Sequence, residues 1–360
     1  MKLSYHLLII LNLLSVLMLM GCLASTNREL DNGIEEEISN GADSLKEPIS
    51  NEMLTIGLSM DTIEEERWLK DRDMFVEAVE KLGARVEVKT ANGNDALQIS
   101  QAETLISQGI DLLVLVPHNA EASTTIVGKA QMADIPVVSY DRLVKNANID
   151  LYISFDNEQI GVLQAEAMTK IVPKGNYVYI GGPVTDNNAL LMREGVYSVL
   201  QPYIERGDIT VVYDQWTDAW LPINAKKNMQ AALEVNGDQI DAVIAANDAT
   251  AGAAYDALEE YGLSGEIPIV GQDAELLGLQ RIVNGGQIMT VYKSIKALTE
   301  QAAEISVQMA RGETIETDLT INNGKKDVPT VLLTPVAVTK DNIEETVIAD
   351  GFHEAEDIFQ

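Results

Sequence analysis

The chain is poor in cysteine, in aromatic side chains and in positive charge. It has one cysteine, Cys22, and 25 Lys and Arg against 56 Asp and Glu, which gives a formal net charge of −31 over 360 residues. A single cysteine excludes a disulfide within the chain. The shortage of basic residues excludes the extended positive surface that nucleic acids require, so we expect no nucleic-acid partner. The length leaves room for two domains.

The N-terminal part is predicted to be a targeting segment followed by a tether. Lys2 precedes an apolar run over residues 7–20, which is typical of a secretory signal. The run ends in Leu-Met-Gly-Cys, which resembles the lipobox of bacterial lipoproteins. That resemblance implies a signal peptide over residues 1–21 and lipidation of Cys22. The polar, acidic residues 22–53 predict a flexible tether.

This pattern places the folded part outside the cytoplasmic membrane, held to it by a lipid anchor. An uncleaved apolar anchor is the alternative, although the run is short for a helix that spans the bilayer. Both interpretations give the same extracytoplasmic location.

After the tether, apolar strand-like runs alternate with helical periodicity. The strands are expected at residues 54–60, 85–89, 110–117, 137–140, 151–155, 177–180, 209–213, 242–245, 267–271, 288–291 and 331–338. This alternation predicts right-handed βαβ units and parallel sheets. The fold class is therefore α/β, with two doubly wound parallel-sheet lobes in succession. Residues 346–360 are expected to form a mostly polar tail.

Polar side chains follow many of the predicted strands. Asp141 and Arg142 come directly after the apolar run at residues 135–140. Similar polar loops follow other strands, at residues 66–70, 186–188, 246–248 and 271–273. Because ligands of open α/β sheets bind outside the carboxyl ends of the strands, we expect these loops to form a ligand site.

The residue types in these loops suit a sugar. A hydroxyl both donates and accepts, so it pairs with carboxylate or amide oxygens and with Arg, Lys or amide N–H groups. An indole can cover the apolar face of a pyranose, and Trp68 and Trp220 could hold the ring between them. Core packing is the other interpretation for each Trp. A solvated surface ion pair is the other interpretation for Asp141 and Arg142.

Several longer motifs then carry a specific resemblance. They are E-R-W-L-K-D-R-D at 66–73, S-Y-D-R at 139–142, D-N-N-A at 186–189, D-Q-W-T-D-A-W-L-P at 214–222, N-D-A-T-A-G at 247–252, G-Q-D-A at 271–274, T-V-Y-K at 290–293 and N-N-G-K-K-D-V-P-T-V-L-L-T-P at 322–335. In this order they resemble the periplasmic sugar-binding proteins of the ribose/galactose-binding superfamily. The likeness is greatest to the D-xylose-binding members that serve bacterial ABC importers.

The resemblance implies the type I periplasmic binding protein fold and a set of sugar-binding residues. That set is Arg67, Trp68, Asp141, Arg142, Asn188, Trp220, Asn247, Asp273 and Lys293. Leu190 and Leu191 stand where other superfamily members place an Arg, and Arg193 is off register. The calcium loop of galactose-binding relatives has no counterpart here, so we expect no metal and no cofactor. The implied partners are a monosaccharide and an ABC permease, and the implied state is a monomer.

The resemblance also implies two lobes joined by three chain crossings. We assign residues 54–156 and 294–327 to the N-terminal lobe, and residues 157–293 and 328–360 to the C-terminal lobe. The crossings are expected near residues 155–158, 291–294 and 325–330. Such a hinge would close the lobes around a ligand that contacts both of them.

Other functions fit the sequence less well. No Cys–His or Ser–His pair is supported by spacing. Asp141 and Asp273 could in principle form the two carboxylates of a glycosidase. However, Arg142 would keep Asp141 ionised, and an ionised carboxylate cannot act as the general acid. We therefore expect no enzymatic activity. A transcription regulator would need a basic helix-turn-helix in place of the acidic tether. A sensor that presents its sugar to a histidine kinase or chemoreceptor stays open, as does glucose or another aldose as the ligand.

Overall fold

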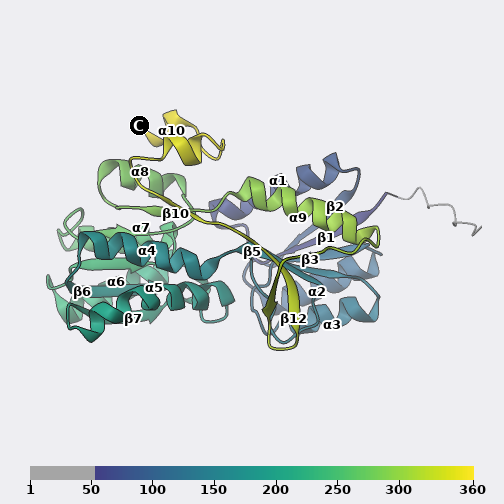
Figure 1. The fold of residues 1–360 in the computed structure, drawn as a ribbon, viewed down its shortest axis with the longest axis horizontal. Helices are drawn as coiled ribbons and strands as arrows, with labels where there is room; N and C mark the ends of the chain where they lie inside the picture. The colour runs from purple at the N-terminus through teal and green to yellow at the C-terminus, as the bar shows by residue number, and fades with distance from the viewer. Residues whose placement is uncertain (1–52) are drawn as a thin grey trace, which may run out of the picture. The chain divides into compact units, whose positions relative to one another are not determined.

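The computed structural model describes residues 53–360, which form two α/β lobes (Figure 1). The predicted signal peptide, Cys22 and residues 22–52 of the predicted tether lie outside the described residues. Within residues 53–360, no helix is both long enough and apolar enough to cross a membrane. The predicted α/β class with parallel sheets is confirmed.

The first lobe is built on a seven-stranded sheet with the order β11-β12-β5-β4-β3-β1-β2. Its strands are β1 (Thr55–Met60), β2 (Arg85–Thr90), β3 (Leu112–Leu115), β4 (Val137–Tyr140), β5 (Leu151–Phe155), β11 (Leu319–Asn322) and β12 (Asp327–Leu333). Only β11 pairs antiparallel with its neighbour. Every residue of β1, β3, β4 and β5 is buried, because helices cover both faces of this parallel sheet.

The helices of the first lobe are α1 (Glu66–Lys81), α2 (Asp95–Ser107), α3 (Thr124–Met132) and α9 (Ile295–Ala310). The helices α1 and α9 pack on each other and share one hydrophobic cluster with the sheet. The helices α2 and α3 contribute to a second cluster on the opposite face. The side chain of Asn94 accepts a hydrogen bond from the Leu97 N–H and so caps α2.

The second lobe has a four-stranded parallel sheet with the order β7-β6-β8-β9, and an antiparallel pair, β10 and β13. Its strands are β6 (Gly175–Gly181), β7 (Ile209–Trp216), β8 (Ala242–Ala245), β9 (Ile269–Val270), β10 (Thr290–Tyr292) and β13 (Val336–Val338). Its longer helices are α4 (Asn157–Ile171), α5 (Asn187–Glu205), α6 (Pro222–Asn236), α7 (Asp248–Glu260) and α8 (Leu276–Asn284). A parallel bridge between Val270 and Met289 joins the sheet to the pair.

The chain passes between the sheets after β5, after β10 and after β12. The third crossing was predicted near residues 325–330, and this is wrong. The Asn-Asn-Gly-Lys-Lys segment instead forms the hairpin turn between β11 and β12, with Gly324 in the left-handed region at φ 93°. Strand β12 then pairs in parallel with β5, so residues 328–333 belong to the first lobe and not to the second.

The predicted single strand at 331–338 is therefore two strands in different sheets, β12 and β13, and the crossing lies between them. The Asn-Asn-Gly-Lys-Lys segment has the residue types that favour a turn. Their local chemistry does not distinguish a hairpin from a lobe crossing, because both need only a reversal or bend of the backbone.

The C-terminal residues do not form the expected polar tail. They carry a π-helical turn (Glu344–Ile348) and a short helix α10 (Ala355–Ile358). Val347, Phe352 and Ile358 are buried in a cluster with Leu279 of α8. The few apolar positions in this stretch are sufficient to fix it to the second lobe.

Candidate functional site

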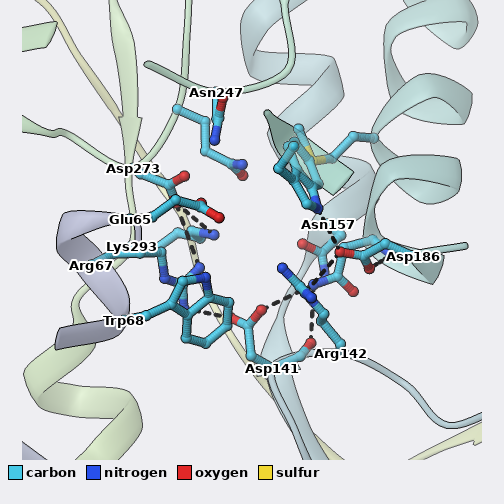
Figure 2. A pocket seen from close by; sticks show the side chains of 14 residues that line it. Glu65, Arg67, Trp68, Asp141, Arg142, Asn157, Asp186, Asn247, Asp273 and Lys293 are labelled. Atoms are coloured by element: carbon cyan, nitrogen blue, oxygen red, sulfur yellow. Dashed lines mark hydrogen bonds and ion pairs between the residues drawn. The ribbon is translucent and has the colours of Figure 1, made fainter. Parts of the chain in front are cut away.

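A cavity lies at the carboxyl ends of the strands, with walls from both lobes (Figure 2). The fourteen lining residues are Glu65, Arg67, Trp68, Asp141, Arg142, Asn157, Asp186, Asn188, Met192, Trp220, Asn247, Gln272, Asp273 and Lys293. The structure thus brings all nine predicted site residues to one cavity. Their role as sugar ligands remains a prediction.

Five lining residues were not predicted. Asp186 and Gln272 lie in motifs from which another residue was chosen, Asn188 and Asp273 respectively, and Asn157 lies at the first lobe crossing. No feature of the sequence indicated that Glu65 or Met192 would line the site. The run of glutamates before Arg67 does not reveal which one faces the cavity.

Arg67, in the first turn of α1, forms ion pairs with two carboxylates of the first lobe. Its Nη2 atom lies 2.8 Å from Asp141 Oδ2 and 3.0 Å from Asp71 Oδ2. Its guanidinium also stacks 4.1 Å from the centre of the Trp68 ring. Burial raises the pKa of Asp141, but the charges of Arg67 and Lys293 outweigh this effect, so the pKa lies below its ordinary value. Asp141 is therefore held as a carboxylate, which accepts hydrogen bonds.

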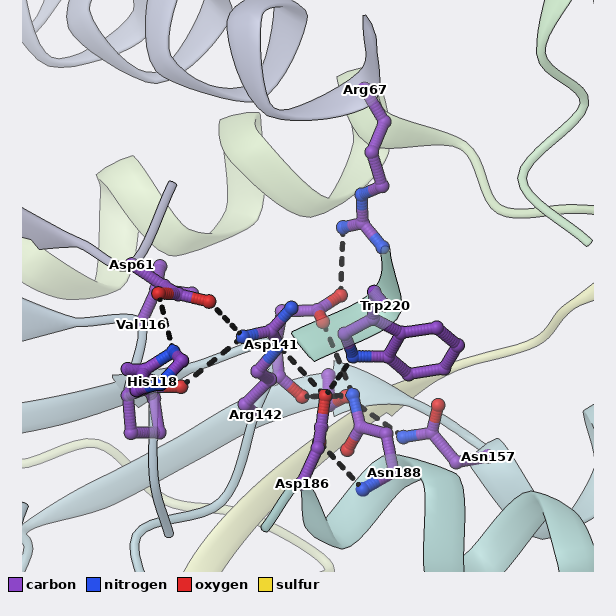
Figure 3. Close-up of polar contacts among 12 residues, drawn as sticks. Asp61, Arg67, Val116, His118, Asp141, Arg142, Asn157, Asp186, Asn188 and Trp220 are labelled. Carbon is purple, nitrogen blue, oxygen red and sulfur yellow. Dashed lines mark hydrogen bonds and ion pairs between the residues drawn. The ribbon is translucent and has the colours of Figure 1, made fainter. Parts of the chain in front are cut away.

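Arg142 connects the two lobes (Figure 3). Its Nη1 atom lies 2.6 Å from Asp61 Oδ2 in the first lobe, and its Nε atom lies 2.8 Å from Asp186 Oδ2 in the second. Asp61 in turn lies 2.8 Å from Nδ1 of His118, and this hydrogen bond raises the pKa of His118. A buried guanidinium with two carboxylate partners is fixed in orientation as well as in charge.

Trp220 is fixed by its backbone and by a hydrogen bond. Ala219 and Trp220 both have left-handed backbone, at φ 53° and 59°. The indole Nε1 donates to Asp186 Oδ2 at 3.1 Å, so one carboxylate binds both Trp220 and Arg142. The indole lies against Gly182, where an added Cβ would be 2.3 Å from the ring. The absence of a side chain at Gly182 therefore makes room for the indole.

Two further site residues also have left-handed backbone. The φ angle is 59° at Asp141 and 91° at Asp273. Non-glycine residues rarely adopt this region, and such strain gathers at binding sites, where the surrounding structure holds a side chain in a set direction. The Asp273 side chain is directed to Lys293, whose Nζ lies 2.8 Å from Asp273 Oδ1.

Asn247 offers a donor to the cavity. It is the N-cap of α7, and its Oδ1 atom accepts hydrogen bonds from the backbone and hydroxyl of Thr250. The cap thus occupies the amide oxygen and leaves the amide NH₂ for a ligand, and Figure 2 shows Asn247 directed to the cavity.

The lobes are in contact across the cleft. Asn188 at the start of α5 donates from Nδ2 to the backbone oxygen and to Oδ1 of Asp141, both at 3.1 Å. Arg67 Nη1 lies 3.5 Å from Asp273 Oδ1. Together with the pair of Arg142 and Asp186, these contacts describe a closed arrangement of the two lobes.

Several buried polar atoms of the cavity wall have no hydrogen-bond partner among the described residues. They are Trp68 Nε1, Asn188 Oδ1, Gln272 Oε1 and Asp273 Oδ1, and the last of these forms an ion pair with Lys293. Leaving a buried donor or acceptor unpaired costs about 1–3 kcal/mol, and native proteins almost always pair such groups. Apart from Asp273, one donor and two acceptors on residues that line this cavity have no partner among the described residues, which indicates a ligand rich in hydroxyl groups.

Comparisons with known proteins agree with this chemistry. The model of a periplasmic binding protein domain matches residues 56–314. The D-xylose-binding periplasmic protein of Escherichia coli is 52% identical over 303 residues, which cover 84% of this chain and 92% of the relative. The protein of the same name from Haemophilus influenzae is 52% identical over 306 residues, which cover 85% and 92%.

Among solved structures, a carbohydrate transporter solute binding protein from Chloroflexus aurantiacus, in complex with D-glucose, has a TM-score of 0.80 and 31% identity. The match covers 85% of this chain and 98% of that one. The predicted type I fold is thereby confirmed. On the family match and the identity over most of its length, the chain belongs to the periplasmic binding protein family.

Proposed function

We propose that the protein is an extracytoplasmic receptor that captures a monosaccharide between its two lobes and delivers it to an ABC permease. The observation that supports this proposal is the polar cavity between the lobes, where buried polar atoms have no hydrogen-bond partner among residues 53–360. The cavity is lined mainly by charged and amide side chains from both lobes, which suit a ligand with many hydroxyl groups.

We propose D-xylose as the principal ligand. Two relatives that share half of the aligned residues are named as D-xylose-binding proteins. D-Glucose is the second candidate, because the Chloroflexus structure that shares 31% of its residues holds that sugar. The two sugars differ by one hydroxymethyl group, so small displacements of the cavity wall decide between them.

We infer that the site binds and does not catalyse. The two carboxylates of a hypothetical glycosidase, Asp141 and Asp273, are each paired with a cation, Arg67 and Lys293 respectively. A cation beside a carboxylate stabilises its charged form, and neither residue is therefore suited to protonate a leaving group.

The remaining parts of the proposal follow the predicted N-terminal segment and the family. Lipidation of Cys22 would hold a monomeric receptor at the outer face of the membrane, within reach of its permease. A role as the sugar sensor of a histidine kinase or chemoreceptor would use the same closed form, and nothing in the site favours it over transport.

The test is a calorimetric titration of the full chain with D-xylose, D-glucose and other pentoses and hexoses. We expect D-xylose to bind most tightly. Asp141→Ala should weaken binding about ten- to hundredfold, because it removes a charged hydrogen-bond acceptor. The matched control is Asp218→Ala, which changes an exposed aspartate outside the cavity and should leave the affinity unchanged. Failure of every sugar to bind more tightly than millimolar would contradict the proposal.

A further inference from the structure

One carboxylate of the cavity wall differs from the others in having no partner in the part of the chain that the structure describes. Asp141, Asp186 and Asp273 each form an ion pair with an arginine or lysine. Glu65 also lines the cavity, but within residues 53–360 its carboxylate makes neither an ion pair nor a hydrogen bond. It has the N-cap position of α1, yet its side chain does not cap the helix. Figure 2 shows this carboxylate directed toward the cavity.

Glu65 also lies where the cavity meets a second hollow. This outer hollow is lined by Asp61, Thr62, Glu64, Glu65, Glu66, Asn92, Gly93, His118, Ala219, Trp220, Leu221, Pro222, Ala249 and Glu275. Glu65 and Trp220 are the two residues common to both linings. One comes from each lobe, so together they form the boundary between the ligand cavity and the outer hollow.

An unpaired carboxylate at this boundary is suited to a ligand hydroxyl. Glu65 is partly buried, and burial raises its pKa to about 7, with Arg142 opposing the rise and Asp273 adding to it. Near neutral pH the group can thus accept hydrogen bonds as a carboxylate or donate one as an acid. A hydroxyl can pair with either form.

We propose that Glu65 is a further ligand-binding residue, which pairs with the sugar hydroxyl that faces the outer hollow and so contributes to the choice of sugar. This inference rests on the proposed function. The partner of Glu65 is a neutral polyol, because a second anion at this position would add to the charge of Asp273 and Asp61. Together with Trp220, Glu65 distinguishes sugars by the chemical group that they present to the outer hollow.

The test is calorimetric titration of the full chain with D-xylose and with D-xylose analogues that each lack one hydroxyl. The variants are Glu65→Ala and Glu65→Gln, and the matched control is Glu64→Gln, an exposed neighbour that lines only the outer hollow. We expect Glu65→Ala to weaken D-xylose binding about ten- to hundredfold, and Glu65→Gln to weaken it less. The control should stay within about twofold of the wild type.

The analogues identify the hydroxyl. One of them should bind to the wild type and to Glu65→Ala with nearly equal affinity, because the partner of Glu65 is already missing from the sugar. If both Glu65 variants bind D-xylose with the affinity of the wild type, the inference is wrong. It is also wrong if the removal of each hydroxyl from the sugar weakens binding by the same factor in the wild type and in Glu65→Ala. Either result would leave the proposed function intact. Absence of sugar binding by the wild type would overturn both. If Glu65→Ala does not fold, Glu65→Gln is compared with the wild type in the same titrations.

Discussion

Arg142 Nε lies 2.8 Å from Oδ2 of Asp186, and the two side chains are 5% and 2% exposed. They come from different lobes, so this buried ion pair is part of what holds the lobes in the closed arrangement. Arg142 also pairs with Asp61, which lies at the end of the first strand of its own lobe. Removing the guanidinium would leave two buried carboxylates without their cation.

We therefore expect Arg142→Met to lower the free energy of unfolding by about 3–5 kcal/mol, the usual cost of removing one partner of a buried pair. Urea unfolding of the full chain measures this. The control is Arg206→Met, since Arg206 is 54% exposed and pairs with Asp208 at the surface, where such a pair contributes at most about 1 kcal/mol. Equal losses in both variants would show that the buried pair contributes no more than a surface pair.

Gly182 allows a separate test of the Trp220 position. A Cβ at residue 182 would come within 2.3 Å of the indole, so Gly182→Ala should displace Trp220 from the cavity wall. We expect sugar affinity to fall about tenfold or more, while the temperature of thermal unfolding changes little. Gly128→Ala is the control, because no heavy atom lies within 4 Å of its added Cβ in α3. That variant should bind sugar normally and gain up to about 1 kcal/mol of stability from the helix preference of alanine.

The raised pKa of Glu275 predicts that the stability of the protein depends on pH. Burial raises its pKa from the ordinary 4.5 to about 9, and Asp248, Asp273, Glu65 and Glu66 add to the rise. The favourable contribution of its protonated form is complete below about pH 4.5 and is lost as the pH rises toward 9. The unfolding free energy of the wild type should therefore fall over this range relative to that of Glu275→Gln.

Urea unfolding at pH 5 and pH 8 checks this prediction. At pH 8 we expect Glu275→Gln to be the more stable protein, and at pH 5 we expect the difference to be small. The exposed Glu266→Gln variant is the control and should follow the wild type at both values. A constant difference between wild type and Glu275→Gln across the range would contradict the assignment.

Lys70 tests whether the C-terminal segment joins the lobes. Its Nζ atom, on α1 of the first lobe, donates to the backbone oxygen of Phe352 at 2.7 Å and lies 4.0 Å from the centre of that ring. Phe352 is buried in the second lobe. Lys70→Ala should weaken sugar binding by about 1 kcal/mol, because it removes a contact between the lobes. Lys81→Ala, which changes an exposed lysine of the same helix, should bind like the wild type in the same titration.

The local sequence was sufficient to predict the two-lobed α/β fold and much of the candidate site. Continuous apolar runs that alternate with helical periodicity specify parallel strands and crossover helices. Because the carboxyl ends of such strands gather at one edge, residues as far apart as Asp141 and Asp273 could be assigned to one site from their positions after strands.

The partners of the site residues depended on the tertiary structure. Arg142 was predicted at the site beside Asp141, but it binds Asp61 and Asp186, which are 81 and 44 positions away in the numbering. Asp186 itself stands two positions before the predicted Asn188 and was passed over, since a loop motif does not reveal which of its side chains turns inward. Glu65 was missed among adjacent glutamates for the same reason.

The sequence by itself therefore determined the fold class, the family and the edge of the sheets at which the site lies, because these depend on periodicity and on local motifs. The path of the chain between the lobes was decided by the tertiary structure, since a turn such as that around Gly324 can serve either a hairpin or a crossing. The same holds for the pairing of buried charges and for the direction of Glu65. Those features depend on which surfaces meet when the lobes close, and segments far apart in the chain supply those surfaces.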